Sequence, residues 1–384
     1  MKKDWIIPES CLDTGVDPRP LRFVFDKSGG NLCISGFCKS GKSLSLLQIA
    51  REIKKFHRDA TILILVSRNI DGAKFKEVSY EIGLKFDLLT YWQFKKNPIH
   101  YNYILCDDVQ LISKSVLLEI KKMANQMVVT INPDLKLFEY DPLTQESLLT
   151  IEEVRQILSP KEYELNNIYH SSGGSILELA KLLLESSFIT PHINSRTCQE
   201  VQICEATCSD EEVLFISKKS EEGHKCGFTS AILLPTNRDI MNYVQALIKQ
   251  KGKEPWKEVM NKWGKIDYDN LNMYLNSNSI NYQCLGSNYG QISNMGHNIN
   301  IMTYHGSMGF EFDNVFLPYV NSGLYISTND DISKNVFVLA MTRARHRLYI
   351  TYSGSLHPYI VLIKDRCRRI RINNETENDN IFTL

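Results

Sequence analysis

The residue types best suited to chemistry lie together in one short segment, Gly36-Phe37-Cys38-Lys39-Ser40-Gly41-Lys42-Ser43. Its spacing, G-x-x-x-x-G-K-S, lets backbone N–H groups close around a phosphate while the lysine reaches the outer phosphate oxygens and the last hydroxyl binds Mg²⁺. An apolar run at 32–34 precedes it and an amphipathic run at 44–53 follows, which predicts the strand and helix that this loop requires. The expected phosphate-binding residues are Gly36, Lys39, Ser40, Gly41, Lys42 and Ser43.

A second segment has the complementary chemistry for a bound cation. The apolar run 103–106 is followed directly by Asp107 and Asp108. A strand of this kind would deliver Asp107 beside Ser43 to hold Mg²⁺, and Asp108 would orient or deprotonate an attacking water. Taken alone, the segment fits an ordinary strand ending in a polar turn equally well, and the phosphate-binding loop upstream favours the cation site.

The elements around these segments alternate between strand and helix. Apolar runs at 61–66 and 127–131 predict buried parallel strands, and 116–123 predicts an amphipathic helix. The first 140 or so residues therefore read as a doubly wound α/β domain whose ligand lies at the carboxyl ends of the strands.

Composition narrows the class of protein. The chain has 384 residues, of which 43% are hydrophobic and 23% charged, as expected for globular domains. We expect a cytoplasmic protein with no membrane segment, because no apolar run reaches 18 residues, no signal peptide is evident, and the ten cysteines are scattered. Zinc ligation is an alternative for the cysteines, but only Cys204 and Cys208 are closely spaced, which favours ordinary thiols. The other residues of that group are Cys198, His224 and Cys226.

The charge balance gives no global attraction to nucleic acid, since 44 basic residues oppose 44 acidic ones. Any nucleic-acid groove must therefore be local. Basic stretches occur at 51–58 and 364–371, although such runs are more often solvated faces of helices or strands.

Two long motifs in the second half resemble those of superfamily 1 helicases of the UvrD/Rep-like branch. Residues 303–317 resemble T-x-H-x-x-K-G-L-E-F-D-x-V-x-L, and 338–348 resemble V-A-x-T-R-A-[RK]. Shorter matches are 107–110 to D-E-x-Q, 90–94 to T-[FY]-H-x-[FL] and 168–171 to N-Y-R-S. The resemblance extends from about residue 30 to 355.

The resemblance implies two RecA-like domains, 1–150 with both phosphate-site segments and 151–384 with an arginine finger and a short polar tail. It implies ATP and Mg²⁺ as ligands, with Lys42, Asp107, Asp108 and Arg343 catalytic, Tyr169 stacked on the base and Glu311 near the ribose. Single-stranded nucleic acid, DNA rather than RNA, would be contacted by residues from both domains. These are Thr90, Tyr91, Trp92, Thr303 and His305, although Tyr91 and Trp92 also fit as core aromatics.

The chain also departs from the family pattern. Asp108 replaces the usual Glu, Leu135 a phosphate-sensing Gln, His170 an Arg, and Met308 a Lys or Gln. The family's large inserted subdomains would fall between Asn69 and Thr90 and between Arg238 and Met302, where too few residues remain to form them.

The sequence therefore supports an ATP-dependent helicase or translocase core, with a partner protein supplying what is missing. The alternative is a nucleotide-gated interaction module with weak or no hydrolysis that regulates a partner. A small-molecule kinase is disfavoured, because it would leave 303–317 and 336–349 without a role.

Overall fold

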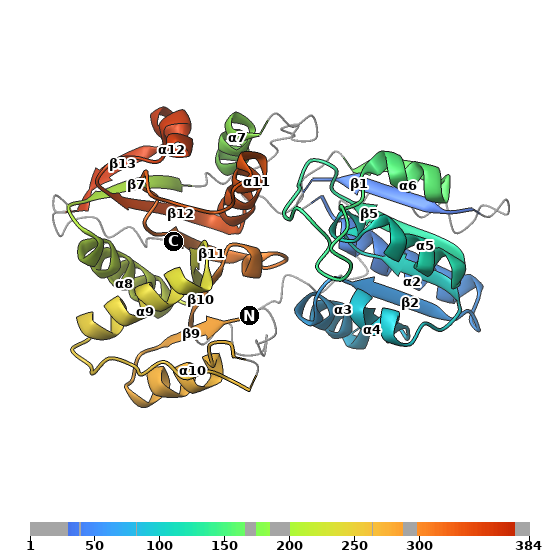
Figure 1. Ribbon diagram of the computed structural model, residues 1–384, viewed down its shortest axis with the longest axis horizontal. Coiled ribbons are helices and arrows are strands. Elements are labelled where there is room, and N and C mark those ends of the chain that lie inside the picture. Colours follow the sequence, from blue (N-terminus) through green and yellow to red (C-terminus); the bar gives the residue numbers. More distant parts are fainter. Residues whose placement is uncertain are drawn as a thin grey trace. The chain divides into compact units, whose positions relative to one another are not determined.

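The computed structural model describes residues 30–37, 40–81, 83–165, 174–184, 200–262, 264–286 and 298–372. These residues fall into two compact units, one of the described residues up to 165 and the other of those from 174 onward. Each unit consists of a β-sheet flanked by helices (Figure 1).

The sheet of the first unit has the strand order β3-β2-β4-β5-β1-β6, and every pairing in it is parallel. The two strands that carry the predicted chemistry, β1 and β4, are separated only by β5. Because parallel strands end at the same edge of a sheet, the loops after β1 and β4 emerge side by side. The strands are β1 (Leu32–Gly36), β2 (Ile62–Val66), β3 (Asp87–Thr90), β4 (Tyr101–Cys106), β5 (Ala124–Ile131) and β6 (Lys161–Leu165).

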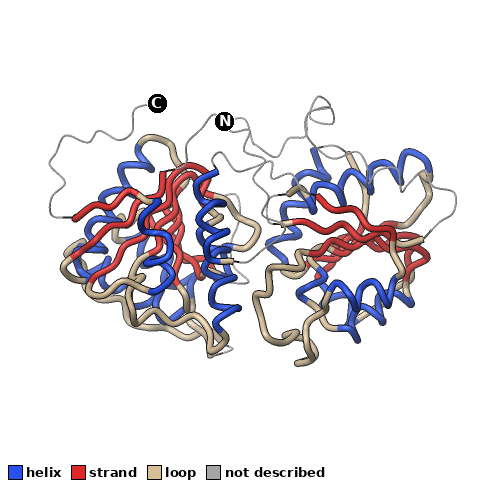
Figure 2. Tube along the Cα trace, turned by 90° about the horizontal axis from the view of Figure 1, so that it is seen from above, coloured by secondary structure: helices blue, strands red, loops and turns tan. Residues whose placement is uncertain are grey.

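Successive side chains of these strands point to opposite faces and fill two cores. Cys33, for example, packs in one apolar cluster and Ile34 in the other. One cluster is covered by α4 (Tyr91–Lys96), α5 (Lys114–Lys122) and α6 (Ile151–Leu158), and the other by α2 (Lys42–Phe56) and α3 (Asn69–Glu81). Figure 2 shows helices on both sides of this sheet. Between β4 and α5 lies the short 3-10 helix η3 (Val109–Leu111).

The second unit repeats the plan with seven parallel strands in the order β13-β7-β12-β11-β8-β10-β9. The strands are β7 (Glu200–Ala206), β8 (Ser230–Leu234), β9 (Tyr282–Leu285), β10 (Ile299–Thr303), β11 (Phe312–Leu317), β12 (Ala344–Ser353) and β13 (Arg368–Arg371).

Its helices also divide into two groups. Helices α8 (Ser209–Lys225), α9 (Asn237–Gln250) and α10 (Tyr268–Ser277) share one apolar core with the sheet. Helix α7 (Gly174–Leu183) packs against α11 (Asp330–Met341) and α12 (Pro358–Ile363). Two 3-10 helices complete the unit, η5 (His305–Ser307) and η6 (Lys364–Arg366).

Two parallel sheets, each flanked by helices, confirm the predicted α/β class. The predicted strands at 61–66 and 127–131 correspond to β2 and β5, and the predicted helix at 116–123 to α5. No described helix has the length and apolar character needed to span a membrane.

The boundary predicted near residue 150 is wrong, because α6 and β6 belong to the first unit. Val154, Ile157 and Leu158 of α6 pack in the core of the first sheet, and β6 pairs with β1 along its whole length. In the described residues the division therefore falls after Leu165.

Candidate nucleotide site and nucleic-acid interface

The phosphate-binding loop begins at a glycine for which no other residue could be substituted without a shift. A Cβ on Gly36 would lie 2.5 Å from Ser40 Oγ and 3.0 Å from the carbonyl oxygen of Leu165 on β6. At the other end of the loop Gly41 has φ of 89°, a left-handed conformation that favours glycine, and it precedes the first residue of α2. The two glycines therefore set the shape of the turn between β1 and α2.

The Lys42 side chain contacts the backbone of this loop. Its Nζ donates to the carbonyl oxygens of Gly36 and Phe37, each at 3.1 Å, and the side chain is buried. Ser40 is also buried, and its hydroxyl has no partner among the described residues. An ammonium carries three N–H donors, and carbonyl oxygens accept two of those of Lys42. The loop therefore offers an anion a cationic donor from Lys42 and a hydroxyl donor from Ser40.

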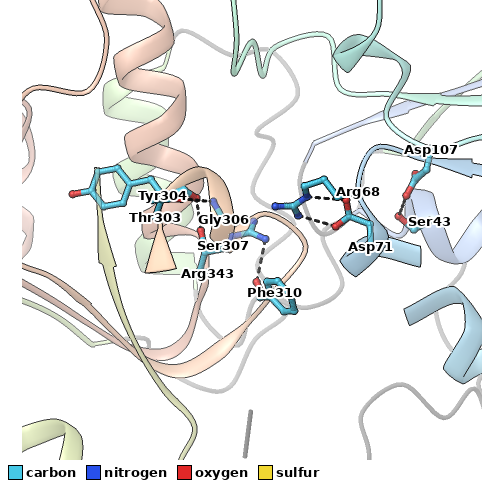
Figure 3. A network of polar contacts seen from close by, with 10 residues as sticks. All are labelled: Ser43, Arg68, Asp71, Asp107, Thr303, Tyr304, Gly306, Ser307, Phe310 and Arg343. Atoms are coloured by element: carbon cyan, nitrogen blue, oxygen red, sulfur yellow. Dashed lines mark hydrogen bonds and ion pairs between the residues drawn. The ribbon is translucent and has the colours of Figure 1, made fainter. Parts of the chain in front are cut away.

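The predicted cation ligands meet at the start of α2. Ser43 Oγ donates to Asp107 Oδ2 at 2.7 Å, and Figure 3 shows the two side chains pointing toward one another. Hydroxyl and carboxylate oxygens are the ligands that Mg²⁺ prefers, together with water and phosphate. The donor set at this position therefore fits Mg²⁺.

The burial of Asp107 and its neighbouring charges favour binding of a cation. Burial and the neighbouring charge of Asp108 raise the pKa of Asp107 to about 7, while hydrogen bonds from Thr130 and Ser43 and the charge of Lys42 lower it. A divalent cation favours the carboxylate over the carboxylic acid, so cation binding would release a proton from this group.

Asp108 is held in an unusual backbone conformation. Its φ of 52° lies in the left-handed region, and its N–H donates to Thr130 Oγ1 at 2.9 Å. Gln110 Nε2 donates to Asp108 Oδ1 at 3.0 Å, and Gln110 Oε1 accepts from the N–H of Asn132 at 3.1 Å. The carboxylate predicted to orient water is thus fixed through both its backbone and its side chain.

Sequence reasoning missed Thr130 and Gln110. Gln110 matches the last position of D-E-x-Q, which was a usable signal. Thr130 lies inside an apolar strand, and only the pairing of β5 with β4 places it beside the two carboxylates.

The three predicted nucleic-acid residues at the start of α4 differ in their exposure and contacts. Tyr91 is only 2% exposed, and its hydroxyl donates to the carbonyl oxygen of Asp107 at 2.8 Å. A buried ring has no free face on which a base can stack, so the burial of Tyr91 favours the core alternative over the predicted nucleic-acid contact. Thr90 caps α4, and its hydroxyl accepts from the N–H of Gln93 at 3.2 Å. Trp92 is 51% exposed, with Lys96 Nζ 4.7 Å from its ring centroid.

In the second unit, Thr303 ends β10 and His305 opens η5. Thr303 Oγ1 accepts from the N–H of Gly306 at 2.9 Å, which ties the strand end to the turn. Glu311 accepts from Arg345 Nε at 3.2 Å, and neither side chain is more than a quarter exposed. The predicted ribose ligand is thus in an ion pair.

Arg343 is the most enclosed of the predicted catalytic residues. Only 4% of it is exposed, and its guanidinium donates to three acceptors of its own unit. These are the carbonyl oxygen of Leu339 at 3.0 Å, Thr342 Oγ1 at 3.1 Å and the carbonyl oxygen of Phe310 at 3.2 Å. Figure 3 shows the contact with Phe310. These three bonds use three of the five N–H donors of the guanidinium.

Three predicted or substituted positions, Lys39, Tyr169 and His170, lie outside the described residues. The part of the chain that is described contains no group of three or more His, Cys, Asp or Glu side chains placed to hold a metal ion. Cys208 and Cys226 are exposed at opposite ends of α8, while Cys204 is buried in β7.

Comparison with known protein families gives one assignment for most of the chain. The family described as UvrD-like helicase C-terminal domain matches residues 48–355. No curated protein matches the chain.

Solved structures with a similar fold include two helicases of low sequence identity. "The structure of PRRSV helicase" shares 13% identity at a TM-score of 0.44, covering 88% of this chain and 55% of that one. "Crystal Structure of DUF1998 helicase MrfA bound to DNA" shares 9% identity at a TM-score of 0.49, covering 90% of this chain and 50% of that one. This chain therefore spans about half the length of each.

Proposed function

The chain belongs to the UvrD-like helicase C-terminal domain family, and from that premise we propose that it is an ATP-dependent helicase or translocase core that acts on single-stranded DNA. The observation that carries the proposal is the 2.7 Å contact between Ser43 Oγ and Asp107 Oδ2. It joins the phosphate-binding loop to the acidic end of β4, which is the arrangement that a Mg²⁺-nucleotide site needs.

Residues of the first unit would bind the phosphates, hold the cation and orient the water during hydrolysis. Lys42 would exchange its two carbonyl acceptors for phosphate oxygens, and Ser43 and Asp107 would hold Mg²⁺. The cation supplies neutralisation of the negative charge that builds up on the phosphates. Asp108 would orient the attacking water, from the position that Gln110 and Thr130 fix.

Single-stranded DNA would lie on residues from both units. Trp92 offers an exposed indole on which a base can stack, and such stacking is worth about 1–3 kcal/mol per base. Thr303 and His305 lie at the carboxyl end of β10, where the resemblance places nucleic-acid contacts. A partner protein would supply the inserted subdomains for which the chain lacks room.

The proposal is tested by steady-state ATP hydrolysis with and without single-stranded DNA. Lys42→Ala should abolish a DNA-stimulated rate, because the loop loses the ammonium that would contact the outer phosphate oxygens. Lys55→Ala is the matched control, since Lys55 lies on the same helix, half exposed, and pairs with Glu52 at 2.6 Å. Turnover that survives Lys42→Ala, or no turnover in the presence of any single strand, would refute the motor.

A second function is favoured by one observation in each unit, namely a nucleotide-gated module that binds ATP, hydrolyses it weakly and regulates a partner. Arg343 donates its guanidinium to its own unit, and the position of the phosphate-sensing Gln is taken by Leu135, which is 3% exposed. A tight, Mg²⁺-dependent binding of ATP without DNA-stimulated turnover would select this function over the first.

A further inference from the structure

One buried hydroxyl joins both acidic residues of the candidate nucleotide site. Thr130 is 0% exposed, and its Oγ1 donates to Asp107 Oδ1 at 2.7 Å while it accepts from the N–H of Asp108 at 2.9 Å. A hydroxyl has one proton and two lone pairs, so these two bonds engage it as donor and acceptor at once. A valine of the same shape would make neither bond.

The strand order puts Thr130 in this place. β5 lies between β4 and β1, with Val129 opposite Cys106 and Thr130 opposite Ile34. Thr130 therefore lies one residue past the last paired position of β4, level with the point where Asp107 and Asp108 leave the sheet.

The two oxygens of Asp107 have different partners. Oδ1 accepts from Thr130, and Oδ2 accepts from Ser43 at 2.7 Å. Because Thr130 holds one oxygen, the other is turned toward the start of α2, where the cation would be bound. Gln110 contacts Asp108 but makes no described bond with Asp107, so it provides an internal comparison.

We propose that Thr130 is a positioning residue for this site, which orients Asp107 toward Mg²⁺ and fixes the left-handed turn at Asp108. The inference rests on the proposed nucleotide-hydrolysing function. It predicts that Thr130 controls both the cation requirement and turnover, whereas Gln110 controls turnover alone.

The test compares Thr130→Val, Thr130→Ser and Gln110→Met in the full chain. Thr130→Val should raise the Mg²⁺ concentration needed for half-maximal binding of a fluorescent ATP analogue and lower kcat by about 10- to 100-fold. Thr130→Ser keeps the hydroxyl and should restore both properties. Gln110→Met should lower kcat and leave the Mg²⁺ requirement unchanged.

The Mg²⁺ requirement for binding separates this inference from the proposed function. A wild-type protein without turnover refutes the hydrolysing function, yet the shift in the Mg²⁺ requirement still tests Thr130. An unchanged requirement in a folded Thr130→Val protein overturns the inference, as does a Thr130→Ser protein as impaired as Thr130→Val. If Thr130→Val does not fold, Thr130→Cys, whose thiol is a weak donor, should give the same shift.

Discussion

Two candidate functional side chains of the first unit, Ser43 and Asp107, bond to each other, whereas Arg343 of the second unit bonds to structural groups of its own unit. Ser43 and Asp107 meet side chain to side chain, while Arg343 donates to two carbonyl oxygens and a neighbouring hydroxyl. The first arrangement is organised before any ligand arrives. The second gives the predicted finger a structural role within its own unit, and this difference is what the following experiments test.

The largest expected effect is at Asp107. Asp107→Asn should reduce Mg²⁺-dependent hydrolysis by about 10²–10³-fold, because the site loses the charge that opposes the cation. Burial disfavours the carboxylate and raises its pKa to about 7, so the metal-free variant should melt at or above the wild-type temperature at pH 8. Hydrolysis assays and thermal melts of the metal-free protein check both parts. A variant that loses activity and stability together would show that Asp107 is structural.

Next in size is Arg343, compared with Arg345. Arg343→Ala should lower the free energy of unfolding by about 3 kcal/mol, because three buried bonds are lost. Arg345→Ala should lower it by less than about 1 kcal/mol, since the ion pair between Arg345 and Glu311 is partly exposed. Urea denaturation of both variants gives the comparison. If Arg343→Ala is as stable as the wild type but inactive, the arginine acts as a finger and its local bonds contribute little.

A smaller effect is expected at the exposed edge of the first unit. Trp92→Ala should weaken binding of single-stranded DNA by about 1–3 kcal/mol, because one stacking platform is lost. Tyr91→Phe removes the bond to the carbonyl oxygen of Asp107 and should leave DNA affinity unchanged. Fluorescence anisotropy with a labelled oligonucleotide measures both. Equal effects of the two substitutions would mean that packing of α4, and not stacking, controls the affinity.

The smallest effect concerns Glu212, a buried carboxylate of the second unit with no catalytic role in the proposal. It accepts from Thr351 and Ser353 at 2.6 and 2.8 Å, and burial raises its pKa above 4.5. Between pH 4.5 and the raised pKa, Glu212 therefore keeps its proton in the folded state and has lost it in the unfolded state. Stability from this group is fully present below pH 4.5 and decreases as pH rises through the raised pKa.

Glu212→Gln removes that titration, so the wild type should lose stability relative to the variant as pH rises from 4.5. Melting temperatures of both proteins over this range provide the measurement. A constant difference at all pH values would show that Glu212 does not titrate in this window.

The sequence predicted the elements whose pattern is local. The glycine and lysine spacing after β1 and the apolar run that ends at Asp107 each identify a strand and its loop without any knowledge of their neighbours. The α/β class follows from the same alternation. The contact between Ser43 and Asp107 was expected because both motifs lie at the carboxyl ends of strands in one sheet.

The errors concern features that depend on the pairing of distant segments. Thr130 looks like any residue of an apolar strand until β5 is placed beside β4. Tyr91 matches an aromatic motif, yet its ring faces the core. The domain boundary was set too early because the strand at 161–165 is polar and largely exposed, although the spacing of Thr150 and Glu153 was a readable helix start.

The close approach of Gly36 and Leu165 has a mechanical consequence. Gly36 opens the phosphate-binding loop, and Leu165 is the last residue of β6. The two are paired in neighbouring strands, and a Cβ on Gly36 would lie 3.0–3.1 Å from Leu165 atoms. No slack separates them, so a backbone displacement of the loop toward β6 has to move the end of that strand. Occupancy of the loop and the position of the strand end at Leu165 are therefore mechanically linked at a single residue pair.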